Sequence, residues 1–281
     1  MRLTVAGGDM RMITVAERFT EIGYKCFIFG FDKHTKGEHG IEYTEDIADA
    51  ISKSSAVILP FPCEKDGFLN MPFSGRKTEL SGIFSLGNEE TIFIGGKLPR
   101  KEKRFIDYSQ NEDFLLRNAV ATAEGAVETA MSLMKTTING AEITVAGYGR
   151  IGSYLATILR HLGANVTIIA RSASRRTLAS ISGVDAVGFE DFEAPLSRAD
   201  IVFNTVPFKV IGESELKSIK TGTAIIDLAS LPGGADEKEC ERFGITLIRA
   251  LGLPGKTAPV SAGEAIFHTV LPILKDRGIK T

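Results

Sequence analysis

The sequence Val145-Ala146-Gly147-Tyr148-Gly149-Arg150-Ile151-Gly152 decides the fold of this chain. It has the spacing G-x-G-x-x-G, and it lies between an apolar segment, residues 143–146, and a helical pattern over residues 150–162. A second apolar segment follows at residues 165–170. A strand, a glycine-rich turn, a helix and another strand form the βαβ unit that binds dinucleotides.

Each glycine of this fingerprint has a physical role. The first permits a tight turn, the second lets the backbone approach a pyrophosphate, and the third lets the helix pack closely on the strand. The start of the helix also offers unpaired N–H groups and the positive end of its dipole. The alternative is a glycine-rich turn that binds no ligand. We expect the phosphates to be bound by Gly147, Gly149, Arg150, Ile151 and Gly152.

The end of the second strand distinguishes NAD from NADP. NAD-binding units usually carry Asp or Glu there, which accepts a hydrogen bond from the ribose 2′-OH. This chain has Ala170-Arg171-Ser172 instead, followed by Arg175 and Arg176. Arginine pairs with a 2′-phosphate, and Ser172 can donate to it. We therefore predict NADP, with NAD less favoured. The alternative is that Arg171 is only a solvated cation at a helix start.

The same alternation of strands and helices extends along the chain. Further strands are predicted over residues 201–204, 223–228 and 245–249, with helices over 213–218 and 236–243 between them. Before the fingerprint, strands are predicted over 3–6, 24–29, 56–59 and 91–94, and residues 62–87 as a long, partly ordered loop. This pattern predicts an α/β fold with two doubly wound parallel-sheet, Rossmann-like domains, as in two-domain NAD(P)-dependent dehydrogenases.

A long helical pattern over residues 119–137 joins the two halves. We expect an N-terminal Rossmann-like or flavodoxin-like domain over residues 1–118 and an NADP-binding domain over residues 119–260. The closing helix, in residues 261–281, is expected to return to the N-terminal domain.

Three turns of the second half follow strands, where open α/β sheets bind their ligands. The third covers residues 251–259. We expect all three to line the nicotinamide side of a cleft, the alternative being turns without a ligand. The first turn supplies Asn204, Thr205, Val206 and Pro207. The second supplies Asp227, Leu228 and Ala229.

The start of the long helix is a candidate substrate site between the domains. Arg117, Asn118 and Thr122 combine polar groups with an expected helix N-terminus, which attracts a carboxylate. Glu124 is the candidate acid or base, or only a first-turn Glu that the helix dipole favours. Arg11, after the first strand, is a further candidate for a carboxylate, although its glycine turn lacks the third glycine and can equally bind nothing.

Composition excludes several functions. The chain has 33 Lys+Arg against 35 Asp+Glu, so its net charge of -2 argues against nucleic-acid binding and against an anionic membrane surface. No apolar run reaches the length that spans a bilayer, and the start of the sequence leads directly into a strand, so no signal peptide is expected. Four histidines, His34, His39, His161 and His268, show no metal-ligand spacing. We interpret the three cysteines as reduced packing residues of a cytosolic protein.

Several motifs together resemble the family of dipicolinate synthase A subunits. They are Asn118 to Gly125, Gly147 to Gly152, Gly163 to Val166, Ala170 to Ser172, Asn204 to Pro207, Asp227 to Gly234 and Gly252 to Pro259. The resemblance implies a cytoplasmic protein of a spore-forming cell that works with the flavoprotein B subunit of dipicolinate synthase. Together the two would convert dihydrodipicolinate into dipicolinate during sporulation. Two-domain relatives are commonly homo-oligomers, and we expect one here.

This resemblance also sets the demands on the site. A dicarboxylate calls for cations, and the candidates are Arg11, Lys97, Arg117 and Lys256. Glu124 is the candidate for proton transfer. Two other functions remain open: an NADP-dependent dehydrogenase of another small acid that acts alone, and a nucleotide-binding subunit whose partner carries out the chemistry.

Overall fold

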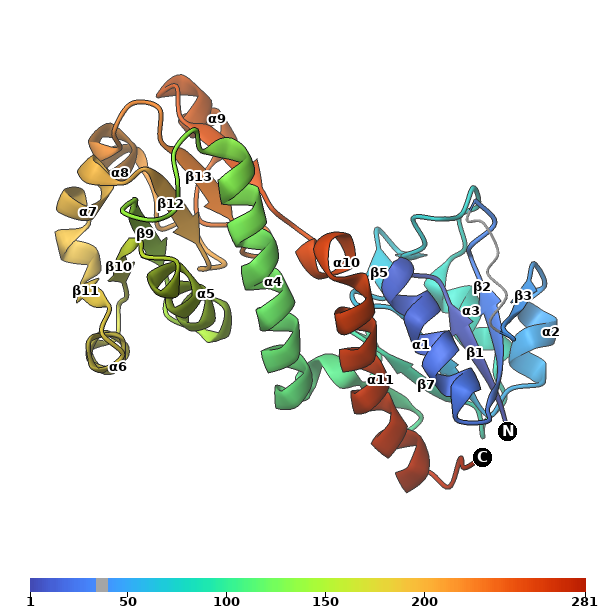
Figure 1. Ribbon diagram of the computed structural model, residues 1–281. Coiled ribbons are helices and arrows are strands. Elements are labelled where there is room, and N and C mark those ends of the chain that lie inside the picture. Colours follow the sequence, from blue (N-terminus) through green and yellow to red (C-terminus); the bar gives the residue numbers. More distant parts are fainter. Residues whose placement is uncertain (34–39) are drawn as a thin grey trace. The chain divides into compact units, whose positions relative to one another are not determined.

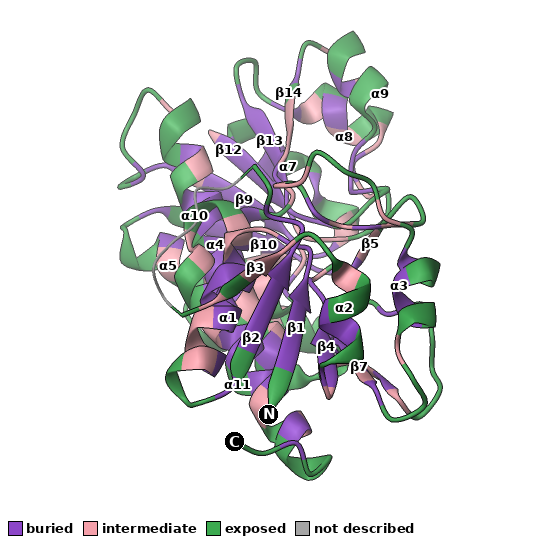
Figure 2. Cartoon of the chain, turned by 90° about the vertical axis from the view of Figure 1, so that its right-hand side faces the viewer, coloured by how far each residue is buried: buried purple, intermediate pink, exposed green. Residues whose placement is uncertain are grey.

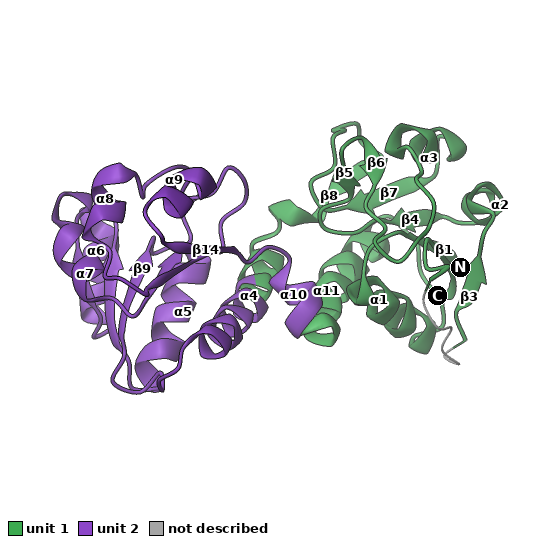
Figure 3. Ribbon diagram, turned by 90° about the horizontal axis from the view of Figure 1, so that it is seen from above, with its two compact units in different colours: residues 1–118, 258–281 green, residues 119–257 purple. Residues whose placement is uncertain are grey.

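The computed structural model describes residues 1–33 and 40–281. These fall into two compact units, Met1–Asn118 with Ala258–Thr281, and Ala119–Thr257 (Figure 3). Each unit contains a six-stranded sheet in which every pair of neighbouring strands is parallel. The predicted α/β class with two Rossmann-like sheets is therefore confirmed.

The sheet of the first unit has the strand order β3-β2-β1-β4-β7-β8. Figure 1 labels β1, β2, β3 and β7 of this sheet. Helix α1 begins at Met10 because the Asp9 carboxylate accepts from the Arg11 backbone N–H. It packs beside α11, where Phe19 and Phe267 meet with ring centroids 4.8 Å apart. The strands are β1 (Arg2–Ala6), β2 (Lys25–Phe29), β3 (Glu42–Thr44), β4 (Ala56–Ile58), β7 (Ile92–Gly95) and β8 (Phe105–Asp107), and the helices are α1 (Met10–Glu21), α2 (Ile47–Ser52), α3 (Leu80–Leu86) and α11 (Pro259–Asp276).

The second unit repeats this plan with the order β11-β10-β9-β12-β13-β14. Its central strands are buried on both faces, as Figure 2 shows, because helices cover the two sides of a parallel sheet. The strands are β9 (Glu142–Ala146), β10 (Asn165–Ile169), β11 (Asp185–Val187), β12 (Ile201–Asn204), β13 (Ala224–Asp227) and β14 (Thr246–Arg249). The helices are α4 (Glu112–Leu133), which starts in the first unit, α5 (Arg150–His161), α6 (Ala173–Ile181), α7 (Glu193–Arg198), α8 (Glu213–Ser218), α9 (Glu237–Arg242) and α10 (Leu253–Thr257).

Two stretches differ from the sequence-based prediction. Residues 62–87 form no long loop, because they contain the hairpin β5 (Glu64–Lys65) and β6 (Phe68–Leu69) and the helix α3. The hairpin turns at Asp66-Gly67, where both residues have positive φ, as a two-residue turn of this type requires. Residues 251–259, expected as a turn, contain the short helix α10.

Helix α4 begins at Glu112 rather than near Ala119. The Asn111 side chain accepts from the Phe114 backbone N–H at 3.0 Å, and two acidic residues occupy the first turn. Both features favour a helix start there. No helix of the described residues is long and apolar enough to cross a membrane.

The three cysteines are free and buried. Burial raises the pKa of the Cys26 and Cys240 thiols to about 11 and that of Cys63 to about 12. The neutral thiol is the stable form at physiological pH, and a nucleophilic role requires the thiolate.

These thiols should therefore be almost unreactive in the native protein at pH 8. A colorimetric disulfide reagent should titrate all three in guanidinium chloride and fewer than one within minutes without denaturant. The denatured sample serves as the control for reagent and protein concentration. Fast native labelling of any cysteine would contradict its assignment as a packing residue.

Candidate functional site

The fingerprint turn connects β9 with α5. Gly147 has φ +99°, and a Cβ there would collide with the Thr205 hydroxyl. A Cβ on Gly152 would collide with the Gly147 carbonyl oxygen. Around Gly149, by contrast, no described heavy atom lies within 4 Å of an added Cβ. The turn therefore needs glycine at its first and third positions for packing, whereas the middle position leaves open space for a ligand against the backbone.

A cavity of about 650 Å³ opens at this turn. The turn forms one wall, the end of β10 another, and the segment after β12 a third. The lining residues include three aromatic residues, Tyr148, Phe189 and Phe208, and three cations, Arg171, Arg175 and Lys209. The full lining is Gly147, Tyr148, Gly149, Ala170, Arg171, Ser172, Arg175, Phe189, Thr205, Val206, Pro207, Phe208, Lys209 and Val210.

The cations near the end of β10 have different roles. Arg171 is exposed, with its guanidinium 6.0 Å from the ring centroid of Phe208. Arg175 is also exposed and has no polar partner among the described residues. Arg176 instead donates to the carbonyl oxygens of Ala170 and Arg171 at 2.9 Å, and these two hydrogen bonds stabilise the turn after β10. Ser172 precedes α6, and its hydroxyl lies 2.7 Å from that of Ser174. Arg171, Arg175 and Ser172 thus remain accessible to an anion.

Lys209 is less available, because its ammonium pairs with the Glu239 carboxylate at 2.7 Å. The hydrogen bond to this carboxylate raises the pKa of Lys209.

Sequence reasoning missed Phe189, Phe208 and Lys209 as residues of the cavity. Their position beside two strand ends depends on the register of the sheet, although Phe208 directly follows a predicted segment.

Three strand ends carry a buried polar network. Asn204, Asp227 and Arg249 end β12, β13 and β14 and lie side by side in register. The Asp227 carboxylate is fully buried and accepts from the Asn204 amide at 2.7 Å and from the Arg249 guanidinium at 2.6 Å. It also accepts from the backbone N–H groups of Ala229 and Gly234. Four donors satisfy the carboxylate and fix the loop after β13.

This network contains two residues of the predicted cofactor set, Asn204 and Asp227. The Asn204 amide donates to Asp227 and to the Val206 carbonyl, and its oxygen accepts from the Val206 N–H. These bonds use both amide hydrogens of Asn204, and Asp227, Leu228 and Ala229 are buried. Their expected contacts with the cofactor stay predictions. These residues shape the loops, whereas Thr205, Val206 and Pro207 line the cavity. Arg249 was missed by sequence reasoning, although the three polar strand ends form a visible pattern.

The residues of α4 lie elsewhere than expected. Because the helix starts at Glu112, Arg117, Asn118 and Thr122 fall inside it, and the predicted helix N-terminus at this point is wrong. The Arg117 guanidinium pairs with Asp113 at 2.8 Å, and this hydrogen bond raises its pKa. Asn118 and Thr122 are largely shielded from solvent in the same helix.

Glu124 is exposed on α4 and lines a shallow hollow with Val127, Met131 and Ile158. The residues of this hollow and those of the fingerprint cavity do not overlap. Lys256 is exposed in the last turn of α10. In the first unit, Arg11 is buried and Lys97 is exposed.

No cluster of at least three His, Cys, Asp or Glu side chains in residues 1–33 and 40–281 has the arrangement of a metal site. His34 and His39 lie outside the described residues. His161 is exposed at the end of α5, and its Nδ1 lies 2.8 Å from the Thr157 carbonyl.

The fold and the fingerprint define the class of protein, a two-unit α/β protein whose second unit is an NAD(P)-binding domain of the dehydrogenase type. Residues 115–230 match the family model of the D-isomer specific 2-hydroxyacid dehydrogenase, NAD binding domain. Residues 2–112 match the model of the N-terminal domain of the dipicolinate synthase A subunit. The chain is a full-length homologue of the dipicolinate synthase A subunit, and the resemblance seen in its sequence is confirmed.

Individual relatives agree with this result. The dipicolinate synthase A subunit of Bacillus subtilis is 28% identical over 290 residues, which cover 98% of this chain and 96% of that protein. The crystal structure of the dipicolinate synthase A subunit from Bacillus halodurans superposes with a TM-score of 0.86 at 25% identity, covering 97% of each chain. A transhydrogenase from Sinorhizobium meliloti, at 15% identity and a TM-score of 0.72 over 99% of this chain and 95% of that one, shares the fold.

Arg249→Ala should destabilise the second unit by about 3 kcal/mol, because it removes the cation from a buried carboxylate. Lys220→Ala is the matched control, since it breaks an exposed pair with Asp200 in the same unit and should cost under about 1 kcal/mol. Urea unfolding measures both. Equal losses in the two variants would show that the Asp227 network does not stabilise the unit.

Proposed function

We propose that this chain is the A subunit of a dipicolinate synthase and that it acts with a flavoprotein B subunit to oxidise dihydrodipicolinate to dipicolinate during sporulation. The full-length match to the Bacillus subtilis protein carries this proposal, because it spans both units rather than the common nucleotide-binding domain alone. The fingerprint cavity supports it, since an oxidation needs an electron acceptor and this cavity suits a dinucleotide.

NADP is the cofactor that we propose for this cavity. The open backbone at Gly149 and the start of α5 suit the pyrophosphate, and the exposed Arg171 suits a 2′-phosphate, with Ser172 and Arg175 beside it. When bound, NADP would supply a nicotinamide ring that accepts a hydride. Thr205 and Val206 would limit the space beside the fingerprint turn.

The reaction removes a hydride and a proton from the dihydropyridine ring, and aromatisation makes it favourable. The protein must hold two carboxylates and accept the proton. We propose Glu124 as the proton acceptor. We also propose Arg11, Lys97 and Lys256 for the carboxylates, together with Arg117, Asn118 and Thr122 of α4.

Coexpression with a flavoprotein B subunit is the decisive experiment. The pair should form the aromatic product, followed by its ultraviolet absorbance, in the presence of NADP. The isolated chain should turn over a panel of keto acids at a negligible rate. Strong activity alone would favour a stand-alone dehydrogenase, and full activity of the partner alone would favour a nucleotide-binding subunit without chemistry. Size-exclusion chromatography would test the proposed homo-oligomer.

Arg171→Ala should weaken NADP binding about ten- to a hundredfold, because it removes charge-assisted hydrogen bonds to the 2′-phosphate. NAD affinity should change less than threefold. Calorimetry with both nucleotides measures this, and Arg160→Ala, at the other end of α5, is the control. An equal loss for NAD and NADP would assign Arg171 another role.

Glu124→Gln should lower kcat of the coexpressed pair at least tenfold while NADP affinity stays unchanged, since the amide cannot accept the proton. Glu128→Gln, one turn further on the same exposed face, is the matched control and should keep native turnover. Undiminished turnover of the Glu124 variant would remove it as the proton acceptor.

A further inference from the structure

The first unit has its own ligand-binding geometry at the carboxyl ends of its strands. The sheet order β3-β2-β1-β4 means that the chain leaves β1 toward one side and returns at β4 on the other. Such a switch point between neighbouring strands is where open α/β sheets bind ligands. The segment from Gly7 to Asp9 follows β1, and the segment from Leu59 to Pro62 follows β4.

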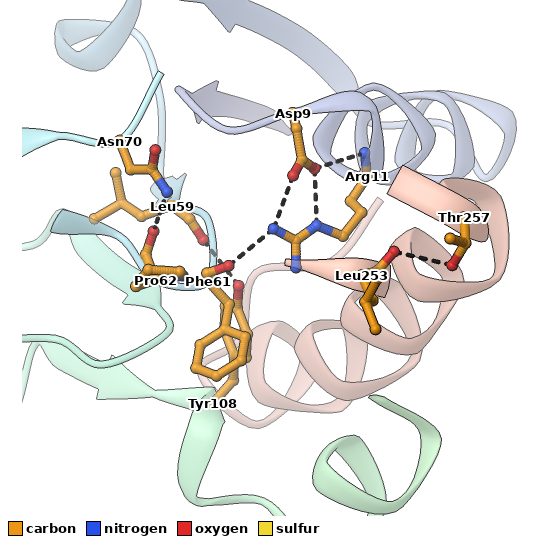
Figure 4. Close-up of polar contacts among 9 residues, drawn as sticks. All are labelled: Asp9, Arg11, Leu59, Phe61, Pro62, Asn70, Tyr108, Leu253 and Thr257. Carbon is orange, nitrogen blue, oxygen red and sulfur yellow. Dashed lines mark hydrogen bonds and ion pairs between the residues drawn. The ribbon is translucent and has the colours of Figure 1, made fainter. Parts of the chain in front are cut away.

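A buried arginine lies at this point (Figure 4). Only 7% of Arg11 is exposed. Its Nε donates to one Asp9 carboxylate oxygen at 2.8 Å, and its Nη2 donates to the other at 2.9 Å. Nη2 also donates to the Phe61 carbonyl at 2.9 Å, so the guanidinium is tied to the loops after both β1 and β4. Its orientation is therefore fixed before any ligand arrives.

These bonds use three of the five guanidinium N–H groups and leave both on Nη1. In Figure 4 no interaction reaches this nitrogen, and none joins it to any described residue. Nη1 is not one of the described side-chain polar atoms that are both shut off from solvent and without a hydrogen-bond partner. It therefore retains contact with the surface. The buried arginine thus presents two donors, unused by the described residues, that the acceptor atoms of a ligand can reach from the surface in place of water.

A second cation stands beside the same loop. The Lys97 ammonium lies 5.8 Å from the ring centroid of Phe61, whose carbonyl binds Arg11. Lys97 follows β7 and has φ +57°, a conformation that is uncommon for a residue with a side chain. Its backbone N–H donates to the Asp107 carboxylate at 3.0 Å and to the Ser109 hydroxyl at 3.1 Å, and these bonds hold it there. Backbone strain of this kind concentrates at functional sites.

We propose that Arg11 and Lys97 bind one carboxylate of a planar ring acid, with Arg11 Nη1 and the Lys97 ammonium as donors beside Phe61, which contacts both residues. This deepens the proposed function, because it assigns a carboxylate of the dihydropyridine dicarboxylate to the first unit. The charges favour a carboxylate over a phosphate. Asp9 pairs with the Arg11 guanidinium, whereas Asp107 accepts from the Lys97 backbone N–H and no ion pair with a described residue engages the Lys97 ammonium. Arg11, Asp9 and Lys97 together thus carry one net positive charge, which matches one carboxylate better than a phosphate dianion.

The test uses pyridine-2,6-dicarboxylate as the probe, in calorimetric titrations of the full chain with NADP bound. Arg11→Gln should weaken its binding at least tenfold, since a charge-assisted donor is lost, and Lys97→Gln should weaken it about three- to tenfold. Arg18→Gln is the matched control, because Arg18 lies in the last turn of the same helix and pairs with Glu21 and Glu264 at the surface. It should bind the probe as the native chain does.

Arg11→Gln leaves the Asp9 carboxylate without its cation, so a second variant, Asp9→Asn with Arg11→Gln, removes both charges. NADP affinity and a cooperative melting curve show that each variant is folded. Native probe affinity in the folded double variant overturns the proposal, as does a native chain that binds NADP but not the probe. Probe binding that depends on Arg11, without turnover in the presence of the flavoprotein, would support this site while removing the proposed reaction.

Discussion

The second unit depends on one close contact, that between Gly152 and the Gly147 carbonyl. Because Gly152 has no Cβ, helix α5 can begin directly against the end of β9. That contact directs the start of the helix, with its free N–H groups, toward the space beyond the sheet. The cavity forms there, between the turn, the end of β10 and the segment after β12. A larger residue would collide with the Gly147 carbonyl oxygen and displace the start of the helix.

Hydrophobic burial explains why most elements were predictable. The central strands of both units are buried on both faces and are therefore short, continuous apolar runs in the sequence. Glycine at the ends of α1 and α5 separates the helical patterns from the strands that follow. The predictions of secondary structure failed where backbone conformation or a local hydrogen bond, rather than hydrophobic burial, determines the structure. Asp66-Gly67 forms a hairpin turn through its positive φ angles, and Asn111 starts α4 by a side-chain hydrogen bond.

The polar residues at the strand ends show a second limit. Asn204 and Asp227 have the composition of cofactor ligands, yet they hydrogen-bond each other because β12 and β13 pair in register. Arg249 completes their network from β14. The first unit uses the same chemistry differently, since Asp9 binds only one edge of Arg11 and leaves Nη1 unused. Identical residue types thus serve structure in one unit and suit ligand binding in the other.

The sequence by itself determined the α/β class, the fingerprint turn, the absence of an acid after β10 and the resemblance to the A subunit of dipicolinate synthase. These features are local in the chain, because each depends on residue spacing within one βαβ unit or on short motifs. Only the tertiary structure decided which polar side chains remain available. Strand register and loop packing pair Asn204 with Asp227 and Arg11 with Asp9, and they bring Phe208 beside Arg171. Such pairings join residues through the geometry of the folded sheet, which residue types alone do not specify.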